Sequence, residues 1–134
     1  MLRKPTRETD PADWFTLGGE RLKSSDVLWS HEGLTALGIE GLQEAVERYL
    51  KGYLIASGWQ LEKTHDLNRL IAEAARRDPR FAQFEDMADE LTFDFFAQLY
   101  PGGDLTHVGE NFVMLRKQAG ELVELIRQLL PQYS

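Results

Sequence analysis

The chain contains no cysteine among its 134 residues. This excludes a disulfide framework, thiolate metal ligands and a cysteine nucleophile. The sequence also lacks any apolar run near the roughly 20 residues that a membrane-spanning helix needs. The basic residues near the N-terminus are not followed by an apolar segment of the signal-peptide kind. We therefore expect a cytoplasmic protein that does not associate with a membrane.

Positive charge is scarce, and the formal net charge is −7. No Lys or Arg lies between Arg80 and Arg116, whereas seven acidic residues do: Glu85, Asp86, Asp89, Glu90, Asp94, Asp104 and Glu110. Nucleic-acid binding usually requires a basic face, so this charge does not favour a nucleotide or RNA partner. The carboxylates at 85–90 lack the Glu-x-x-His pattern of di-iron bundles. A solvated face or a docking surface is the preferred interpretation, and we predict no metal and no cofactor.

Apolar residues recur at steps of three and four through most of the chain, which is the pattern of amphipathic helices. Asp-Pro pairs at 10–11 and 78–79 place a capping residue before a proline, as is typical of helix starts. The pattern predicts five helices: 10–33, 38–56, a short one over 67–74, one opening at 78–79 and ending near 100–103, and one ending before Pro131. We predict an all-α antiparallel helical bundle in a single domain, residues 1–134, with residues 1–10 flexible.

Two apolar stripes are expected to form the core. One, on the second helix, comprises Ile39, Leu42, Val46, Tyr49, Leu50, Tyr53 and Leu54; the other, on the last helix, comprises Phe112, Leu115, Ala119, Leu122, Ile126 and Leu129. Gly18 and Gly19 inside the first helix suggest that a neighbouring helix approaches closely there. Phe93 and Phe96 lie off the inward stripe of the fourth helix, and exposed apolar side chains of this kind predict an interface. We therefore expect a homodimer that uses these two rings.

Two motifs carry a resemblance to a known family. Residues 43–54 read Gln-Glu-Ala-Val-Glu-Arg-Tyr-Leu-Lys-Gly-Tyr-Leu, and residues 63–67 read Lys-Thr-His-Asp-Leu. Together with Tyr100-Pro101-Gly102, they resemble the HEPN domain, and the similarity extends over roughly 14–130. The resemblance implies an all-helical fold and a nucleic-acid or nucleotide-related function. It also implies a tendency to dimerise and a partner of the minimal nucleotidyltransferase class.

The ribonuclease motif of that family is missing. HEPN ribonucleases use an Arg, four to six spacer residues and then a His, because metal-free RNA cleavage needs a proton-transfer group and a fixed cation for the phosphate. The required positions hold Ser, Ser and Asp before His31, and Gly, Trp and Gln before His65. They hold Tyr, Pro and Gly before His107. The chain therefore resembles a HEPN protein without the catalytic pair.

The motif residues allow two readings. Thr64 or Asp66 can cap the third helix, with His65 packed over the loop; alternatively, His65 and Asp66 contact a nucleotide or a protein partner. We favour the cap. Glu47 and Lys51 are an i, i+4 pair in the favoured order, which predicts support of a helix surface; contact with phosphate is the alternative role of Lys51.

Three functions follow, in order of preference. The first is a non-catalytic binding or accessory protein, not an enzyme, that works as a homodimer or with a nucleotidyltransferase-type partner or a nucleotide ligand. The second is a ribonuclease toxin, as in toxin–antitoxin systems, whose displaced arginine, Arg69 or Arg116, lies near His65 or His107. An Arg and a His lining one groove would favour it. The third is a nucleotide-binding module in which Lys51, Lys63 and Tyr100 surround a phosphate and a base.

Overall fold

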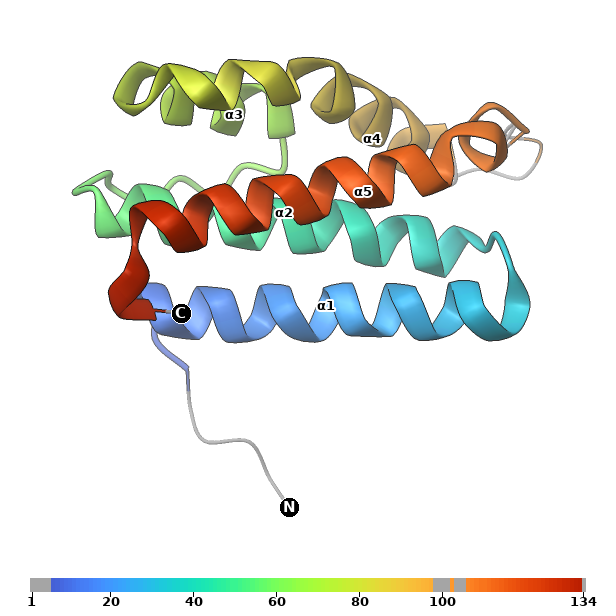
Figure 1. Cartoon of the computed structure of the whole chain (residues 1–134), viewed down its shortest axis with the longest axis horizontal. Coiled ribbons are helices and arrows are strands. Elements are labelled where there is room, and N and C mark those ends of the chain that lie inside the picture. Colours follow the sequence, from blue (N-terminus) through green and yellow to red (C-terminus); the bar gives the residue numbers. More distant parts are fainter. Residues whose placement is uncertain (1–5, 98–101, 103–105, 134) are drawn as a thin grey trace.

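The computed structural model describes residues 6–97, 102 and 106–133, and these residues contain helices but no strand. The elements are α1 (Pro11–Glu32), α2 (Ala36–Ala56), α3 (Leu67–Arg77), the 3₁₀ helix η1 (Pro79–Phe84), α4 (Glu85–Ala97), α5 (Thr106–Leu129) and the 3₁₀ helix η2 (Pro131–Tyr133). The prediction of an all-α bundle with five helices is confirmed (Figure 1).

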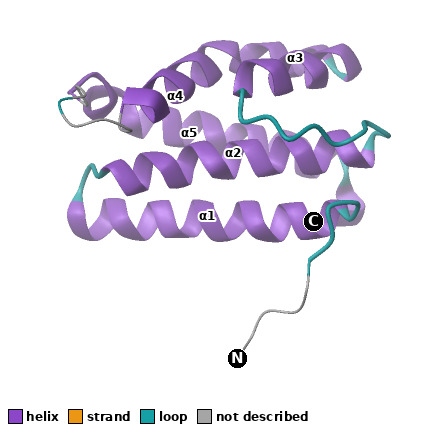
Figure 2. Ribbon diagram, turned by 180° about the vertical axis from the view of Figure 1, so that it is seen from behind, coloured by secondary structure: helices purple, strands orange, loops and turns teal. Residues whose placement is uncertain are grey.

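Helix α2 is the centre of the bundle. It forms an antiparallel hairpin with α1 and also packs against α3, α4 and α5. In Figure 1, α1 forms one outer layer, α2 and α5 lie side by side in the middle, and α3 and α4 form the opposite layer. Figure 2 shows the loop that leads from α2 to α3 crossing the back of α2. This loop brings the Lys-Thr-His-Asp-Leu motif to the face of the helix that carries the first motif.

The predicted capping residues stand at the helix starts. The Asp10 side chain accepts from the amide of Ala12 at 3.0 Å, and the Asp66 side chain accepts from the amide of Asn68 at 3.0 Å. Just beyond α2, Gly58 adopts a φ of 89°, the left-handed conformation expected of a glycine that follows a helix end. Asp66, rather than Thr64, is the cap of α3.

Two predicted helix starts were inaccurate. Helix α2 begins at Ala36, two residues before the predicted start, because the hydroxyl of Thr35 accepts from the amide of Gly38 at 2.9 Å and caps the helix there. The fourth segment does open after Asp78, as predicted, but its first six residues form the 3₁₀ helix η1 before α4 begins at Glu85. The predicted end of that helix near Tyr100 and Pro101 lies outside the described residues.

The two predicted stripes form the core. Ile39, Leu42, Leu50 and Leu54 of α2 are fully buried, as are Ala119 and Leu122 of α5. Of the two stripes, Leu129 alone is only partly buried. The glycine prediction is confirmed at Gly18, where an added Cβ would lie 2.8 Å from Cδ2 of Tyr49. Side-chain size at this position therefore limits how closely α1 and α2 can pack.

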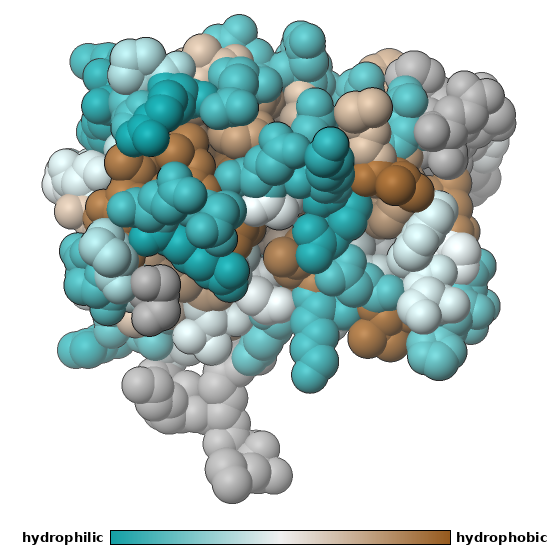
Figure 3. Space-filling model, viewed as in Figure 1, coloured by the Kyte–Doolittle hydropathy of each residue, from teal (hydrophilic) through white to brown (hydrophobic). Residues whose placement is uncertain are grey.

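The surface is mostly hydrophilic on the face shown in Figure 3, with smaller apolar patches between polar side chains. Phe93 is 66% exposed, whereas the side chain of Phe96 lies outside the described residues. Among the described helices, none is both long and apolar enough to span a bilayer. Residues 1–5 also lie outside the described part, and the predicted flexibility of residues 1–10 stays a prediction.

Candidate functional site

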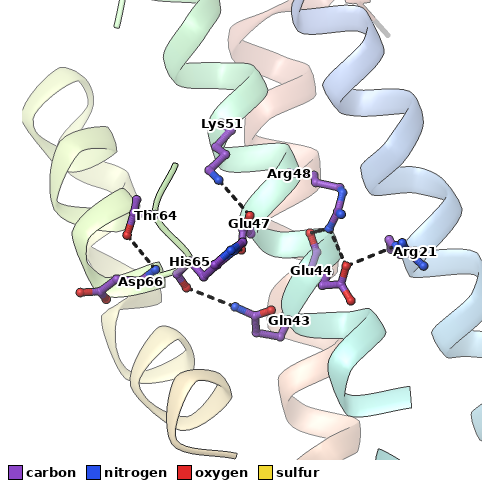
Figure 4. A network of polar contacts seen from close by, with 9 residues as sticks. All are labelled: Arg21, Gln43, Glu44, Glu47, Arg48, Lys51, Thr64, His65 and Asp66. Atoms are coloured by element: carbon purple, nitrogen blue, oxygen red, sulfur yellow. Dashed lines mark hydrogen bonds and ion pairs between the residues drawn. The ribbon is translucent and has the colours of Figure 1, made fainter. Parts of the chain in front are cut away.

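The two sequence motifs meet at the carboxylate of Glu47. Its Oε2 accepts from Nζ of Lys51 at 2.9 Å, and its Oε1 lies 2.9 Å from Nδ1 of His65 (Figure 4). The first contact is the predicted i, i+4 pair, but its predicted location was wrong. The side chains of Lys51 and Glu47 are only 4% and 5% exposed, so this ion pair is buried rather than on the surface.

The burial of Lys51 has two causes in the tertiary structure. Its Nζ lies 5.6 Å from the centroid of the Trp14 ring, a cation–π distance between α2 and α1. The Glu47 carboxylate, which pairs with Lys51, is in turn contacted by His65 of the loop before α3. A buried ammonium is costly unless it is paired and hydrogen-bonded. The carboxylate of Glu47 therefore offsets the cost of burying the Lys51 ammonium.

A second set of bonds fixes the loop on α2. The carbonyl of His65 accepts from Nε2 of Gln43 at 3.3 Å, and the amide of Asp66 donates to the Thr64 hydroxyl at 3.1 Å. The His65 side chain is nevertheless 77% exposed. With Nδ1 directed at Glu47, its Nε2 makes no hydrogen bond to the described residues. Contacts with Gln43 and Glu47 therefore hold the loop against α2, while Nε2 of His65 remains accessible.

His65 borders a groove of about 210 Å³ on this face of α2. The groove is lined by Glu40, Gln43, Glu44, Glu47, Arg48 and His65. Nη1 of Arg48 lies 2.9 Å from Oε2 of Glu44, and Nε of Arg21 lies 3.4 Å from the same oxygen. Arg48 and His65 therefore line the same groove, although the two residues are not separated by the spacing of the ribonuclease motif. Because Arg48 and His65 lie 17 positions apart, the sequence pattern did not bring them together.

The arginines suggested by the sequence are held by other partners. Arg69 makes two bonds to the carboxylate of Glu62, at 2.6 and 2.8 Å, and Arg116 makes two bonds to Asp26, at 2.6 and 3.0 Å. Each of these guanidiniums is engaged by a carboxylate in the fork geometry that arginine favours. Arg69 and Arg116 do not line the groove beside His65, whereas Arg48 does. The side chain of His107 lies outside the described residues, so its predicted proximity to Arg116 stays a prediction.

The three residues of the predicted nucleotide site are not gathered in the described structure. Lys63 is exposed and borders a different groove of about 330 Å³, which Trp59 and Leu61 also line. Lys51 is buried under Trp14 and lines neither groove, and Tyr100 lies outside the described residues. No group of three His, Asp or Glu side chains among the described residues is arranged to hold a metal ion.

Partial burial and a neighbouring carboxylate raise the pKa of Glu40, which lines the groove beside His65. Partial burial is the main cause, and the neighbouring carboxylate of Glu44 is the next. A carboxyl whose pKa is raised by folding favours the folded state only while it is protonated, so this contribution is lost as the pH rises through the folded-state pKa.

Replacing Glu40 by glutamine should therefore stabilise the protein at pH 7 by about 0.2–0.5 kcal/mol, the size of a like-charge i, i+4 repulsion. The gain should shrink as the pH falls below the ordinary glutamate value of 4.5, where Glu40 is protonated in both states. Urea unfolding of both proteins at pH 7 and pH 4 measures it. A gain of equal size at both values would show that charge is not the cause.

Comparison with known proteins gives one match. No curated protein and no solved structure matches the chain. The family model described as HEPN domain matches residues 12–131, from the first turn of α1 to the start of η2. This span includes Glu47 with its partners Lys51 and His65, the groove beside His65, and residues of all five α-helices. The chain belongs to the HEPN domain family.

Proposed function

We propose that this HEPN protein is a non-catalytic accessory protein whose groove binds a basic segment of another protein. The proposed partner is of the nucleotidyltransferase class, which the family membership brings into consideration. The single observation that carries the proposal is the charge of the groove. Glu40, Glu44 and Glu47 line it, and Arg48 is the only Lys or Arg among the described residues that do so. Glu44 is paired with Arg48 and Arg21, and Glu47 is paired with Lys51, so Glu40 is the lining carboxylate that has no ion-pair partner among the described residues.

This charge distribution distinguishes between classes of ligand. The Arg48 guanidinium is already paired with Glu44, so it does not offer a free cation to a phosphate. Lys51 is likewise paired and is almost fully buried. A phosphate would be repelled by the Glu40 carboxylate, whereas an arginine or lysine of a partner would meet complementary charge there. The groove therefore supports a protein ligand better than a nucleotide or RNA.

Partner binding can be tested with a purified minimal nucleotidyltransferase from the same genome. We expect light scattering after gel filtration to show a complex of the two proteins. Glu40→Lys should weaken it about tenfold or more, because a like charge placed against a basic segment is costly. Glu121→Lys, an equal charge change at an exposed position on α5, is the control and should bind as the parent does. Absence of a complex at micromolar concentration, or equal weakening by both variants, would contradict the proposal.

A second candidate function is supported by the same groove. His65 has its Nδ1 on a carboxylate and its Nε2 accessible, which is the arrangement that orients a general acid or base. Arg48 lines the groove with it, as a displaced catalytic arginine would. RNA cleavage that is lost in both His65→Ala and Arg48→Ala would favour this function. We rank it second because Arg48 is already paired with Glu44 and the Glu40 carboxylate opposes the approach of a phosphate backbone.

We also propose that the protein forms a homodimer through Phe93 and Phe96 of α4. Phe93 is 66% exposed there, and such rings are usually covered in an interface. Replacing both Phe93 and Phe96 by serine should convert the dimer to a monomer without loss of helix content. Light scattering and circular dichroism give the two readouts. A parent protein with a mass near 15.4 kDa at micromolar concentration would contradict the dimer, and a dimer retained in the double variant would contradict its location.

A further inference from the structure

A second cavity lies away from the contacts of Glu47 with Lys51 and His65, where the two ends of the described chain meet. Figure 1 shows η2 turning down from α5 to lie beside the start of α1. The cavity has a volume of about 280 Å³. It is lined by Ala12, Phe15, Thr16, Tyr49, Ile126, Arg127, Leu130 and Tyr133. These residues come from α1, α2, α5 and η2, so the cavity exists only in the folded bundle.

Three aromatic rings form one wall of this cavity. Phe15 stacks on Tyr49 with centroids 5.8 Å apart, and it meets Tyr133 edge-on at 5.5 Å. Two glycines make room for these rings. A Cβ added to Gly52 would lie 2.5 Å from Cε1 of Phe15, and one added to Gly18 would lie 2.8 Å from Tyr49. Because Phe15 and Tyr49 pack against glycines of α2 and α1, this part of the wall is formed before any ligand arrives.

The charge on the cavity is the opposite of that on the groove beside His65. Arg127 is the only charged residue among the eight that line it. It is exposed, and it has no ion-pair partner among the described residues, although the chain carries a net charge of −7. A guanidinium presents planar donors that match a carboxylate or a phosphate. An aromatic wall beside a free guanidinium is complementary to a flat ring that carries an anionic group.

We propose that this cavity is a binding site for a small planar aromatic anion. The ring of the ligand would pack on Phe15 and Tyr133, and its carboxylate or phosphate would pair with Arg127. The volume lies near the lower end of the range for small-molecule sites, about 300–1,000 Å³, so one ring or two fused rings suit it. The site is independent of the protein-binding groove and of any partner bound there.

The experiment uses three ligands that share one ring system: 2-naphthoate, 2-naphthyl phosphate and the neutral 2-naphthamide. Isothermal titration with the full chain should show that at least one anion binds with a dissociation constant of about 1 mM or lower, which is within reach for about 13–15 non-hydrogen atoms. The neutral amide should bind about tenfold or more weakly, since it lacks the charge-assisted bonds. Comparison of the two anions identifies the preferred group, carboxylate or phosphate.

Two variants locate the binding. Arg127→Gln should reduce affinity for the preferred anion about tenfold or more and leave the weak affinity for the amide unchanged. Tyr133→Ala should weaken all three ligands, because it removes part of the ring wall. Arg76→Gln on α3 is a matched control at another exposed arginine and should bind as the parent does. Lack of binding by both anions, or equal affinity of the parent and Arg127→Gln for them, would overturn the proposal.

Discussion

Replacing Glu47 by leucine should lower the free energy of unfolding by about 3–5 kcal/mol, the cost of leaving one partner of a buried ion pair alone. The reason is the environment of Lys51, whose side chain is 4% exposed and whose ammonium lies near the Trp14 ring and the Glu47 carboxylate. Without that carboxylate, the ammonium must lose its charge or reach water by disrupting the contact between α1 and α2. Urea denaturation at pH 7 measures the loss.

A double-mutant cycle separates this cause from simple loss of packing. Lys51→Met should cost a similar amount, because it leaves the Glu47 carboxylate buried beside a single exposed histidine. The double variant Glu47→Leu/Lys51→Met should lie within about 1–2 kcal/mol of the parent, since apolar residues of similar volume can replace a buried pair. Glu44→Gln is the control, because its carboxylate is 20% exposed and should contribute about 1 kcal/mol or less. Additive losses in the double variant would show that the two side chains are not coupled.

The core assignment has an equally large expected effect. Val46→Asp should destabilise the protein by more than about 4 kcal/mol, because it places a carboxylate with no partner at a position that is 1% exposed. Val46 lies on the apolar stripe of α2, which packs against the rest of the bundle. Thermal unfolding followed by circular dichroism measures the change. Melting at the temperature of the parent would mean that the wrong face of α2 had been assigned to the core.

Leu37→Asp provides the matched control on the same helix. Leu37 is 62% exposed in the first turn of α2, where a negative charge interacts favourably with the helix dipole. This variant should unfold within about 0.5 kcal/mol of the parent, or slightly above it. The pair of variants therefore tests position rather than the general effect of adding an aspartate to an acidic chain.

Local patterns in the sequence were enough to predict most of the fold. Helix period and Asp-Pro caps depend on residues close in sequence. They located α1 and α3 closely, and Pro131 located the end of α5. The start of α2 was missed because the cap at Thr35 precedes Ala36 and Leu37, which show no clear periodic signal. The 3₁₀ geometry of η1 was also missed, since its apolar residues Phe81 and Phe84, three apart, suit either helix type.

The candidate site was harder to predict because its contacts join distant segments. An i, i+4 Glu–Lys pair is a common surface feature, so Glu47 and Lys51 were assigned to the surface. Their burial depends on Trp14, which lies 37 positions before Lys51, and on His65 in the loop before α3. The shared groove of Arg48 and His65 likewise depends on how that loop crosses α2. Spacing along one helix carries no information about these contacts.

We expect this HEPN domain to lack ribonuclease activity. The most direct test is to incubate the purified protein with single-stranded and structured RNA and to follow the RNA by gel electrophoresis. We predict that both RNAs remain intact, because Arg48 of the groove is paired with a carboxylate and no histidine follows an arginine at the required spacing. Cleavage by the parent protein that is abolished by His65→Ala or by His107→Ala would contradict this expectation.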